Sequence, residues 1–214
     1  MKYTDVVWDF NGTILDDVDV CIGCANKLLS DYSLPLIESK ERYLEVFGFP
    51  IIEYYERLGF DFDKIDYDVL ARVWVDEYLS HADECGLYSG VIPAMDRFKE
   101  SGLGQFVLSA TEIGMLTGQM KKLSIFERFD GVYGIDNIRA ASKLASAERL
   151  KEEHKGAKFV FIGDTEHDLE VASAIGADCV LVASGHQPKH KLLSTSAVFV
   201  ADTLGEACDF ILSK

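Results

Sequence analysis

The sequence of 214 residues predicts an α/β fold, a doubly wound and mainly parallel sheet with a Rossmann-like core and an inserted all-α cap domain. Two observations lead to this prediction. Short apolar segments alternate with amphipathic segments of helical length through most of the chain. After the first apolar segment, however, a long block carries only helical patterns. Parallel strands need crossover helices on both faces of the sheet, and this alternation supplies them.

The first strand is expected at Val6–Trp8, an apolar run that ends at Asp9 and opens into a turn at Asn11 and Gly12. Apolar residues then recur at a spacing of three to four, which is typical of helices, and Pro and Gly residues separate the segments. The expected helices of this block are 16–32, 38–47, 51–58 and 67–83, and the block has no convincing strand pattern.

The alternation of strands and helices resumes after Gly90. The expected strands are 106–108, 131–134, 158–162, 179–182 and 198–200, and the expected helices are 112–123, 143–154, 168–175 and 204–212. We therefore expect residues 1–15 and 90–214 to form the core and residues 16–89 to form the helical cap domain, with linkers at 15–17 and 87–93.

Composition restricts the classes of partner. The chain has 36 acidic and 21 basic residues, a formal net charge of −15, so its surface should repel nucleic acid. A small anionic ligand remains compatible, because one local cation or metal ion outweighs a diffuse field. No apolar run is long enough to cross a membrane, and the N-terminus has no signal-peptide core, so we expect a cytoplasmic protein that does not bind membranes.

The five cysteines are expected to stay reduced in that compartment. Cys21 and Cys24 have the spacing of half a zinc site, but no second pair with such spacing follows. Three residues apart on a helix they share one face, so we interpret them as small apolar packing residues.

Polar side chains stand at the carboxyl ends of three expected strands, where open parallel sheets bind their ligands. Asp9 follows the first strand, Ser109 the second, and Asp164 and Asp168 the fourth, while Lys143 opens the helix before that strand. Taken singly, each could be a helix cap, a turn residue or a solvated side chain. Together, the carboxylates suit a hard cation such as Mg²⁺, and the Lys and hydroxyl suit the oxygens of a phosphate.

These residues carry a resemblance to a family. Asp9-Phe10-Asn11-Gly12-Thr13-Ile14-Leu15-Asp16 resembles the first signature of haloacid dehalogenase-like hydrolases, an apolar strand followed by D-x-D-G-T-L. Ser109 and Lys143 are similar to the second and third signatures, and Gly163-Asp164-x-x-x-Asp168 is similar to the fourth. The resemblance covers essentially the whole chain, including a helical cap inserted after the first strand, as in phosphoglycolate phosphatase-like members.

The resemblance implies a phosphoric monoester hydrolase that acts on a small phosphorylated metabolite. Asp9 is expected to attack phosphorus and form an aspartyl-phosphate. Mg²⁺ is expected to bind the Asp9 carboxylate, the Asn11 backbone carbonyl and Asp164, with Asp168 as a further carboxylate at or behind the metal. Ser109 and Lys143 are expected to hold the phosphoryl oxygens. The expected catalytic residues are therefore Asp9, Asn11, Ser109 and Lys143, and the expected metal ligands are Asp9, Asn11, Asp164 and Asp168.

Asn11 departs from the family pattern. Phosphatases of the family carry Asp at this position, which protonates the leaving group and then activates the hydrolytic water. An amide cannot move a proton, and general acid–base catalysis is typically worth ~10²–10⁴-fold. Three compensations are open: a substrate with a good leaving group, a catalytic residue supplied by the cap, or a role other than rapid hydrolysis.

Other functions stay open on the same residues. A weakly active or binding-only homologue is the main alternative, and a sugar phosphomutase is another, although it too relies on the acid that Asn11 replaces. A dehalogenase would use the Asp9 nucleophile without Mg²⁺, and the pair of Asp164 and Asp168 disfavours it.

Two further features are interpreted as unremarkable. The stretch 186–191, which contains His186 and His190, invites a metal-binding interpretation, but we expect a polar, mobile surface loop. Arg42, Arg57 and His81 of the expected cap could contact substrate, but solvated helix faces routinely carry such residues.

Overall fold

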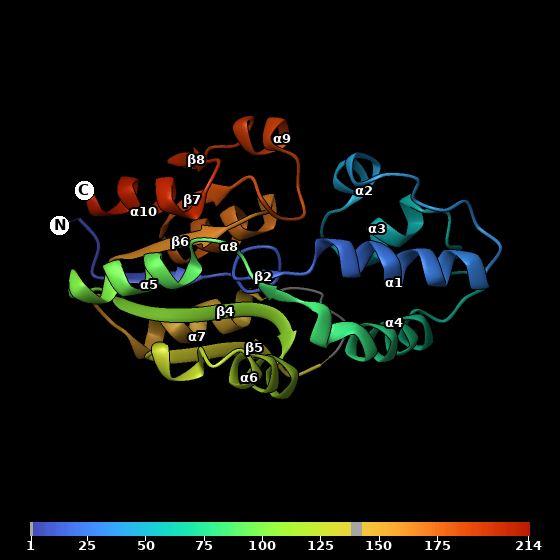
Figure 1. Ribbon diagram of the computed structural model, residues 1–214, viewed down its shortest axis with the longest axis horizontal. Helices are drawn as coiled ribbons and strands as arrows, with labels where there is room; N and C mark the ends of the chain where they lie inside the picture. The colour runs from blue at the N-terminus through green and yellow to red at the C-terminus, as the bar shows by residue number, and fades with distance from the viewer. Residues whose placement is uncertain (1, 138–142) are drawn as a thin grey trace.

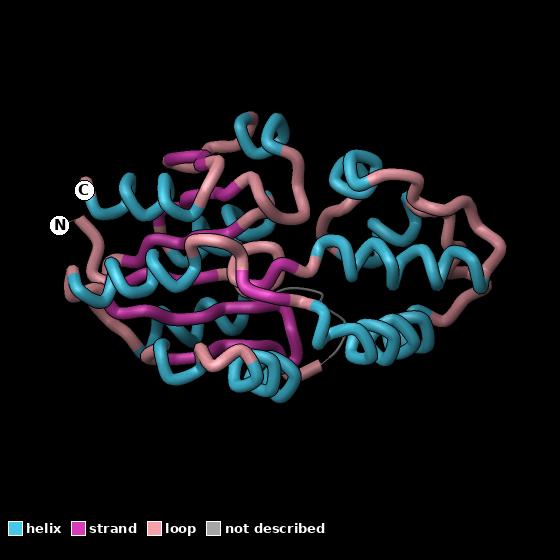
Figure 2. The backbone as a smooth tube through the Cα atoms, in the orientation of Figure 1, coloured by secondary structure: helices cyan, strands magenta, loops and turns pink. Residues whose placement is uncertain are grey.

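The structure is a computed structural model that describes residues 2–137 and 143–214. Its main sheet has six strands, all parallel, in the order β5-β4-β1-β6-β7-β8 (Figures 1 and 2). The strands are β1 (Asp5–Trp8), β4 (Gly104–Glu112), β5 (Gly131–Ile135), β6 (Phe159–Gly163), β7 (Asp178–Val182) and β8 (Phe199–Ala201). The predicted α/β fold class is confirmed.

Helices cover both faces of this sheet, and each face has its own hydrophobic cluster. The core helices are α5 (Val91–Glu100), α6 (Ile113–Lys122), α7 (Leu144–Glu153), α8 (Glu166–Ile175), α9 (Lys189–Leu193) and α10 (Leu204–Leu212), with a 3₁₀ turn η2 (Phe126–Arg128). Apolar residues of α5, α6 and α10 pack on one face, and those of α7, α8 and α9 pack on the other.

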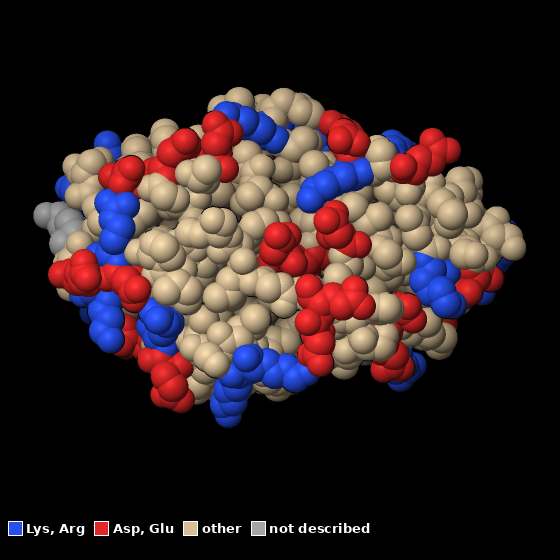
Figure 3. Space-filling model, viewed as in Figure 1, with Lys and Arg blue, Asp and Glu red and all other residues tan. Residues whose placement is uncertain are grey.

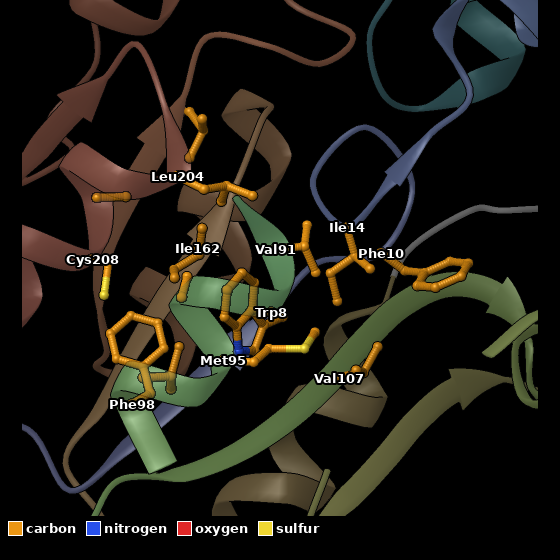
Figure 4. Packing of buried hydrophobic residues seen from close by; sticks show 14 of the residues in the cluster. Trp8, Phe10, Ile14, Val91, Met95, Phe98, Val107, Ile162, Leu204 and Cys208 are labelled. Atoms are coloured by element: carbon orange, nitrogen blue, oxygen red, sulfur yellow. The ribbon is translucent and has the colours of Figure 1, made fainter. Parts of the chain in front are cut away.

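Strand β1 lies in the middle of the sheet and is buried on both sides. Val6 and Trp8 belong to one cluster and Val7 to the other, as the alternation of side chains along a strand requires. The Trp8 ring packs at 5.7 Å from the ring of Phe98 (Figure 4). Its Nε1 donates to Gln105 at 3.2 Å. This packing fixes the strand that ends at Asp9.

A helical segment lies beyond the carboxyl ends of the strands, on the right in Figure 1. It consists of α1 (Val18–Asp31), α2 (Lys40–Val46), α3 (Ile51–Arg57), α4 (Tyr67–His81) and the 3₁₀ turn η1 (Ala82–Glu84). These helices surround a third hydrophobic cluster, in which Leu28, Leu29 and Leu70 are fully buried. We propose that residues 16–89 are the cap domain and that residues 1–15 and 90–214 are the core.

Cys21 and Cys24 lie in this third cluster with free thiols, as expected for apolar packing residues. Among the described helices, none is both long enough and apolar enough to span a membrane. Acidic side chains gather over the junction of core and cap on the face seen in Figure 3, and that face has no continuous basic area.

The structure corrects the predicted elements in three places. Strands β2 (Leu15–Asp16) and β3 (Gly86–Leu87) pair antiparallel where the cap joins the core, and two residues are too few to reveal a strand pattern. Helix α5 was not predicted, and it begins inside the predicted linker 87–93. Pro93 lies in the first turn of this helix, where its missing N–H costs nothing. Helix α9 begins after Pro188, inside the stretch predicted to be a loop.

Candidate active site

The predicted site residues come together at the carboxyl edge of three adjacent strands, β4, β1 and β6. Asp9 follows β1, Asp164 follows β6, and Asp168 lies in the first turn of α8. Ser109 lies within β4, where the register against β5 shifts between Leu108 and Glu112. Lys143 is the N-cap residue of α7. All five side chains are buried; Asp9 is the most accessible, at 7%.

Lys143 lies at the centre of the site. Its Nζ donates to Oδ1 of Asp9, to Oδ1 of Asp168 at 2.5 Å and to the carbonyl oxygen of Leu108 at 3.3 Å. Burial by itself lowers the pKa of Lys143, but the charges of Asp168 and Asp9 outweigh burial and raise this pKa above its usual value. The side chain is therefore a fixed cation between two carboxylates.

Asp168 uses both carboxylate oxygens within the protein. Oδ1 accepts from Lys143, while Oδ2 accepts from the backbone N–H of Asp164 at 3.1 Å, from the N–H of Thr165 at 2.9 Å and from its hydroxyl at 2.7 Å. This reciprocal cap at the start of α8 orients the turn that carries Asp164. A Cβ at Gly163 would lie 2.3 Å from Cγ of Asp168, so the turn requires glycine there.

The acidic cluster fits a divalent cation. Carboxylate oxygens of Asp9, Asp164 and Asp168 lie within 4.8 Å of one another, and Lys143 balances only one of the three charges. Burial raises the pKa of Asp9, and the neighbouring carboxylates of Asp168 and Asp164 raise it further. Burial also raises the pKa of Asp164 to about 6. An all-oxygen donor set with uncompensated negative charge is the chemistry that Mg²⁺ prefers.

Two glycines allow the backbone to approach Asp164 closely. A Cβ at Gly12, whose φ is +77°, would lie 2.4 Å from Oδ2 of Asp164, and a Cβ at Gly185 would lie 2.1 Å from the same atom. Asp164 also accepts from the hydroxyl of Thr13 at 3.1 Å and from the backbone N–H of His186 at 2.6 Å. The carboxylate is thus held in place by the turn after β1 and by the loop after β7.

Asn11 is held by a network that joins the core to the cap. Its amide nitrogen donates to Oδ2 of Asp17 at 2.7 Å and contacts the hydroxyl of Tyr78, on cap helix α4, at 3.1 Å. Its amide oxygen accepts from the hydroxyl of Thr111 at 2.7 Å. Because a carboxylate accepts and never donates, Asp17 fixes which end of the amide faces it.

Asp17 and His186 form a buried pair that the sequence analysis missed. Oδ1 of Asp17 lies 3.2 Å from Nε2 of His186 and accepts from the N–H of Gly12 at 3.0 Å, while Oδ2 accepts from Tyr78 at 2.9 Å. Burial lowers the pKa of His186, but Asp17 outweighs burial and raises it to about 9. The other ring nitrogen of His186 lies 2.8 Å from the hydroxyl of Tyr43.

The expectation of a mobile surface loop at 186–191 was therefore wrong at its start. His186 and Gln187 are both only 4% exposed, because Asp17, Asp164 and the cap hold this part of the loop. No local signal could reveal it, since Asp17 is 169 residues away in the sequence. Asp17, Cys21 and His186 also lie close enough to suggest a metal site, but the hydrogen bonds of Asp17 account for both of its oxygens.

A cavity of about 160 Å³ lies between this site and the cap. Asp9, Asn11, Ser109, Lys143, Asp164 and Asp168 all line it. Its other side is an aromatic wall, which we define as Tyr43, Phe47, Phe49, Tyr54, Tyr55, Tyr67, Trp74 and Tyr78. Arg42, Arg57 and His81 do not line the cavity, and His81 pairs with Glu77 and Glu84 at the surface.

The sequence is related to proteins of known family. The family model described as "Haloacid dehalogenase-like hydrolase" matches residues 6–182. A phosphoglycolate phosphatase of Caulobacter vibrioides is 26% identical over 189 residues, which cover 85% of this chain and 79% of that protein. A 5'-nucleotidase of Pseudomonas aeruginosa is 26% identical over 224 residues, which cover 92% of this chain and 95% of that protein.

The fold has solved counterparts as well. A haloacid dehalogenase-like family hydrolase from Streptococcus pneumoniae superposes with a TM-score of 0.83 at 19% identity, covering 98% of this chain and 99% of that one. At this identity the likeness concerns the fold alone. The chain therefore belongs to the haloacid dehalogenase-like hydrolase family, in which its curated relatives include phosphatases.

Proposed function

We propose that this hydrolase is a Mg²⁺-dependent phosphatase that acts on a small phosphorylated metabolite through an aspartyl-phosphate on Asp9. In this proposal the catalytic residues are Asp9, Asn11, Ser109 and Lys143. The metal ligands are Asp9, the backbone carbonyl of Asn11 and Asp164, with Asp168 as a further carboxylate at or behind the metal, because both of its oxygens already accept hydrogen bonds. The observation that carries the proposal is the convergence of a buried nucleophile, a buried cation and two further carboxylates in one cavity.

The residues of the site divide the reaction into two displacements. An oxygen of Asp9 forms a bond to phosphorus, and the bond from phosphorus to the leaving oxygen breaks. Water then attacks the same phosphorus, and Asp9 is released with inorganic phosphate. Lys143 and Ser109 hold the phosphoryl oxygens through both displacements, and Mg²⁺, when bound, offsets their negative charge.

The cap contributes to this proposal by closing the site. Tyr78 contacts Asn11 and Tyr43 contacts His186, so hydrogen bonds connect two cap helices to the core beside the cavity. A site covered in this way excludes bulk water and strengthens the electrostatic contacts inside it. The binding-only alternative rests on Asn11, and turnover of a generic phosphate ester in the presence of Mg²⁺ separates the two functions.

Replacing Asp164 with Ala is expected to lower the affinity for Mg²⁺ by about 100-fold, because it removes an oxygen ligand from a cation site. Isothermal titration of the phosphate-free protein with Mg²⁺ measures this affinity. Asp63→Ala, which removes an exposed carboxylate from a cap loop, is the matched control and should leave it unchanged. Unchanged affinity in Asp164→Ala would exclude this carboxylate as a ligand.

Replacing Asn11 with Asp tests the missing acid. On the catalytic argument alone, the new carboxyl should raise kcat/KM for alkyl phosphates and barely affect kcat/KM for aryl phosphates, whose leaving oxygen is a weaker base. The structure adds a cost, because the new carboxylate would face Oδ2 of Asp17 where the amide now donates at 2.7 Å. We therefore expect the single variant to lose about 1–3 kcal/mol of stability and to gain no activity.

The double variant Asn11→Asp/Asp17→Asn is the companion experiment. It keeps one negative charge and one amide in the pair and restores a donor between the two side chains. We expect it to recover only part of the lost stability in urea unfolding, because Asp17→Asn also removes the charge beside His186, and to turn over alkyl phosphates faster than the wild type. A single variant as stable as the wild type would show that the contact between Asn11 and Asp17 does not constrain position 11.

A further inference from the structure

The aromatic wall gives the cavity a character that the phosphate chemistry does not require. Its side chains pack on one another, so their positions are fixed before any ligand binds. The Phe47 ring lies 5.3 Å from that of Tyr43 and 5.2 Å from that of Tyr54, and Trp74 stacks on Tyr78 at 5.0 Å with an interplanar angle of 15°. A rigid aromatic surface favours a flat apolar group, which it can bind at little entropic cost.

The size of the cavity sets a limit on that group. An apolar cavity of about 150 Å³ takes one benzene ring. The cavity here has about 160 Å³. A single ring is therefore close to this space in size, whereas a nucleoside or a disaccharide is much larger.

The charges that line the cavity exclude a second anionic group on the substrate. Among the described residues that line it, Lys143 and His186 are the basic ones. Lys143 is already paired with Asp9 and Asp168, and His186 is paired with Asp17. A carboxylate or second phosphate beside the aromatic wall would thus be buried without a cationic partner, which is costly.

The amide at position 11 is a separate reason to expect an aromatic substrate. Without an acid at position 11, the leaving oxygen departs with its negative charge and takes a proton from water. A phenol such as that of Tyr has a pKa of about 10, against about 15.7 for water, so a phenolate leaves far more easily than an alkoxide. An aryl ester is the substrate for which the missing acid matters least.

From these observations, and resting on the proposed function, we propose that the substrate is a small aryl phosphate whose single ring is uncharged. Asp9 forms its bond to phosphorus while the bond between phosphorus and the phenolic oxygen breaks, and water then releases inorganic phosphate. The products are one phenol and one phosphate for each water consumed. The aromatic wall binds the ring, and Trp74 is a residue that determines specificity.

The test compares three probes in Mg²⁺: phenyl phosphate, 4-carboxyphenyl phosphate and 2-phosphoglycolate, with acetyl phosphate as a non-aromatic substrate that has a good leaving group. We expect kcat/KM for phenyl phosphate to exceed that for 4-carboxyphenyl phosphate at least tenfold and that for 2-phosphoglycolate at least a hundredfold. Equal or higher values for either charged probe would overturn the proposal, as would a preference for a phosphotyrosyl peptide over phenyl phosphate.

A pair of cap variants tests the wall itself. Trp74 is half-buried, so Trp74→Leu should fold, and it should raise KM for phenyl phosphate roughly tenfold while leaving acetyl phosphate unaffected. Tyr32→Leu replaces an exposed cap aromatic that does not line the cavity, and it should change neither value. Equal effects of the two variants would contradict a role for the wall.

Hydrolysis of acetyl phosphate without preference for phenyl phosphate would refute the substrate class alone, whereas hydrolysis of neither would refute the phosphatase function as well.

Discussion

Replacing Asp9 with Asn is expected to abolish hydrolysis of 4-nitrophenyl phosphate, with a loss of at least about 10⁴-fold in kcat. The amide has nearly the shape of the carboxylate, but it cannot attack phosphorus and it carries no charge for Lys143 or a metal ion. Near-normal unfolding in urea would show that the loss is chemical and does not come from misfolding.

Asp5→Asn provides the matched control for this variant. Asp5 begins the same strand, β1, at the edge of the sheet opposite the site. The substitution is identical in chemistry and should leave kcat within about twofold of the wild type, because it lies outside the cavity. Full activity of Asp9→Asn would contradict the nucleophile assignment, whatever the control does.

Replacing Lys143 with Met is expected to lower both the stability of the protein and its kcat/KM by large amounts. The variant removes the cation from between Asp9 and Asp168, which leaves two buried carboxylates facing each other. Breaking a buried ion pair from one side costs about 3–5 kcal/mol of stability. Loss of the contact to the phosphoryl group should lower kcat/KM by a further 10²–10³-fold, roughly the effect of one oxyanion donor.

Urea unfolding and steady-state kinetics separate these two losses. Lys122→Met is the control, because Lys122 pairs with Asp83 at the surface with its side chain 68% exposed, and exposed pairs contribute little. A Lys143→Met protein as stable as the wild type would mean that the carboxylates are compensated by other groups. Added Mg²⁺ that restores stability without activity would support the account, since the metal replaces the charge but not the anion contact.

Much of the fold followed from the sequence, for a physical reason. Parallel strands have their carboxyl ends at one edge, so an Asp, a Ser and a second Asp after three such strands were expected to converge, and the structure brings Asp9, Ser109 and Asp164 together. Val6–Trp8 was recognisable as a buried strand because both faces of β1 are covered. The elements that were not predicted are short, such as β2 and α9, or contain a proline near their start, as α5 does at Pro93.

The parts of the site that could not be predicted depend on contacts between distant segments. Nothing near His186 in the sequence indicates burial, which arises from Asp17, Asp164 and Tyr43. The aromatic residues of the cap have a helical spacing that is equally compatible with packing inside the cap and with lining the cavity. Only the folded structure shows which of them line the cavity. Asn11 was visible as a departure from the family motif, but its pairing with Asp17 was not.

Detection of the phosphorylated enzyme shows directly whether Asp9 is the nucleophile. Wild-type protein is mixed with 4-nitrophenyl phosphate and Mg²⁺, quenched with acid within the first turnover, digested, and mapped by mass spectrometry. Because Asn11 cannot activate the attacking water, breakdown of the intermediate should be slow, and one phosphoryl group should accumulate on Asp9. Steady turnover without any phosphorylated protein, or a phosphoryl group on a different residue, would contradict Asp9 as the nucleophile.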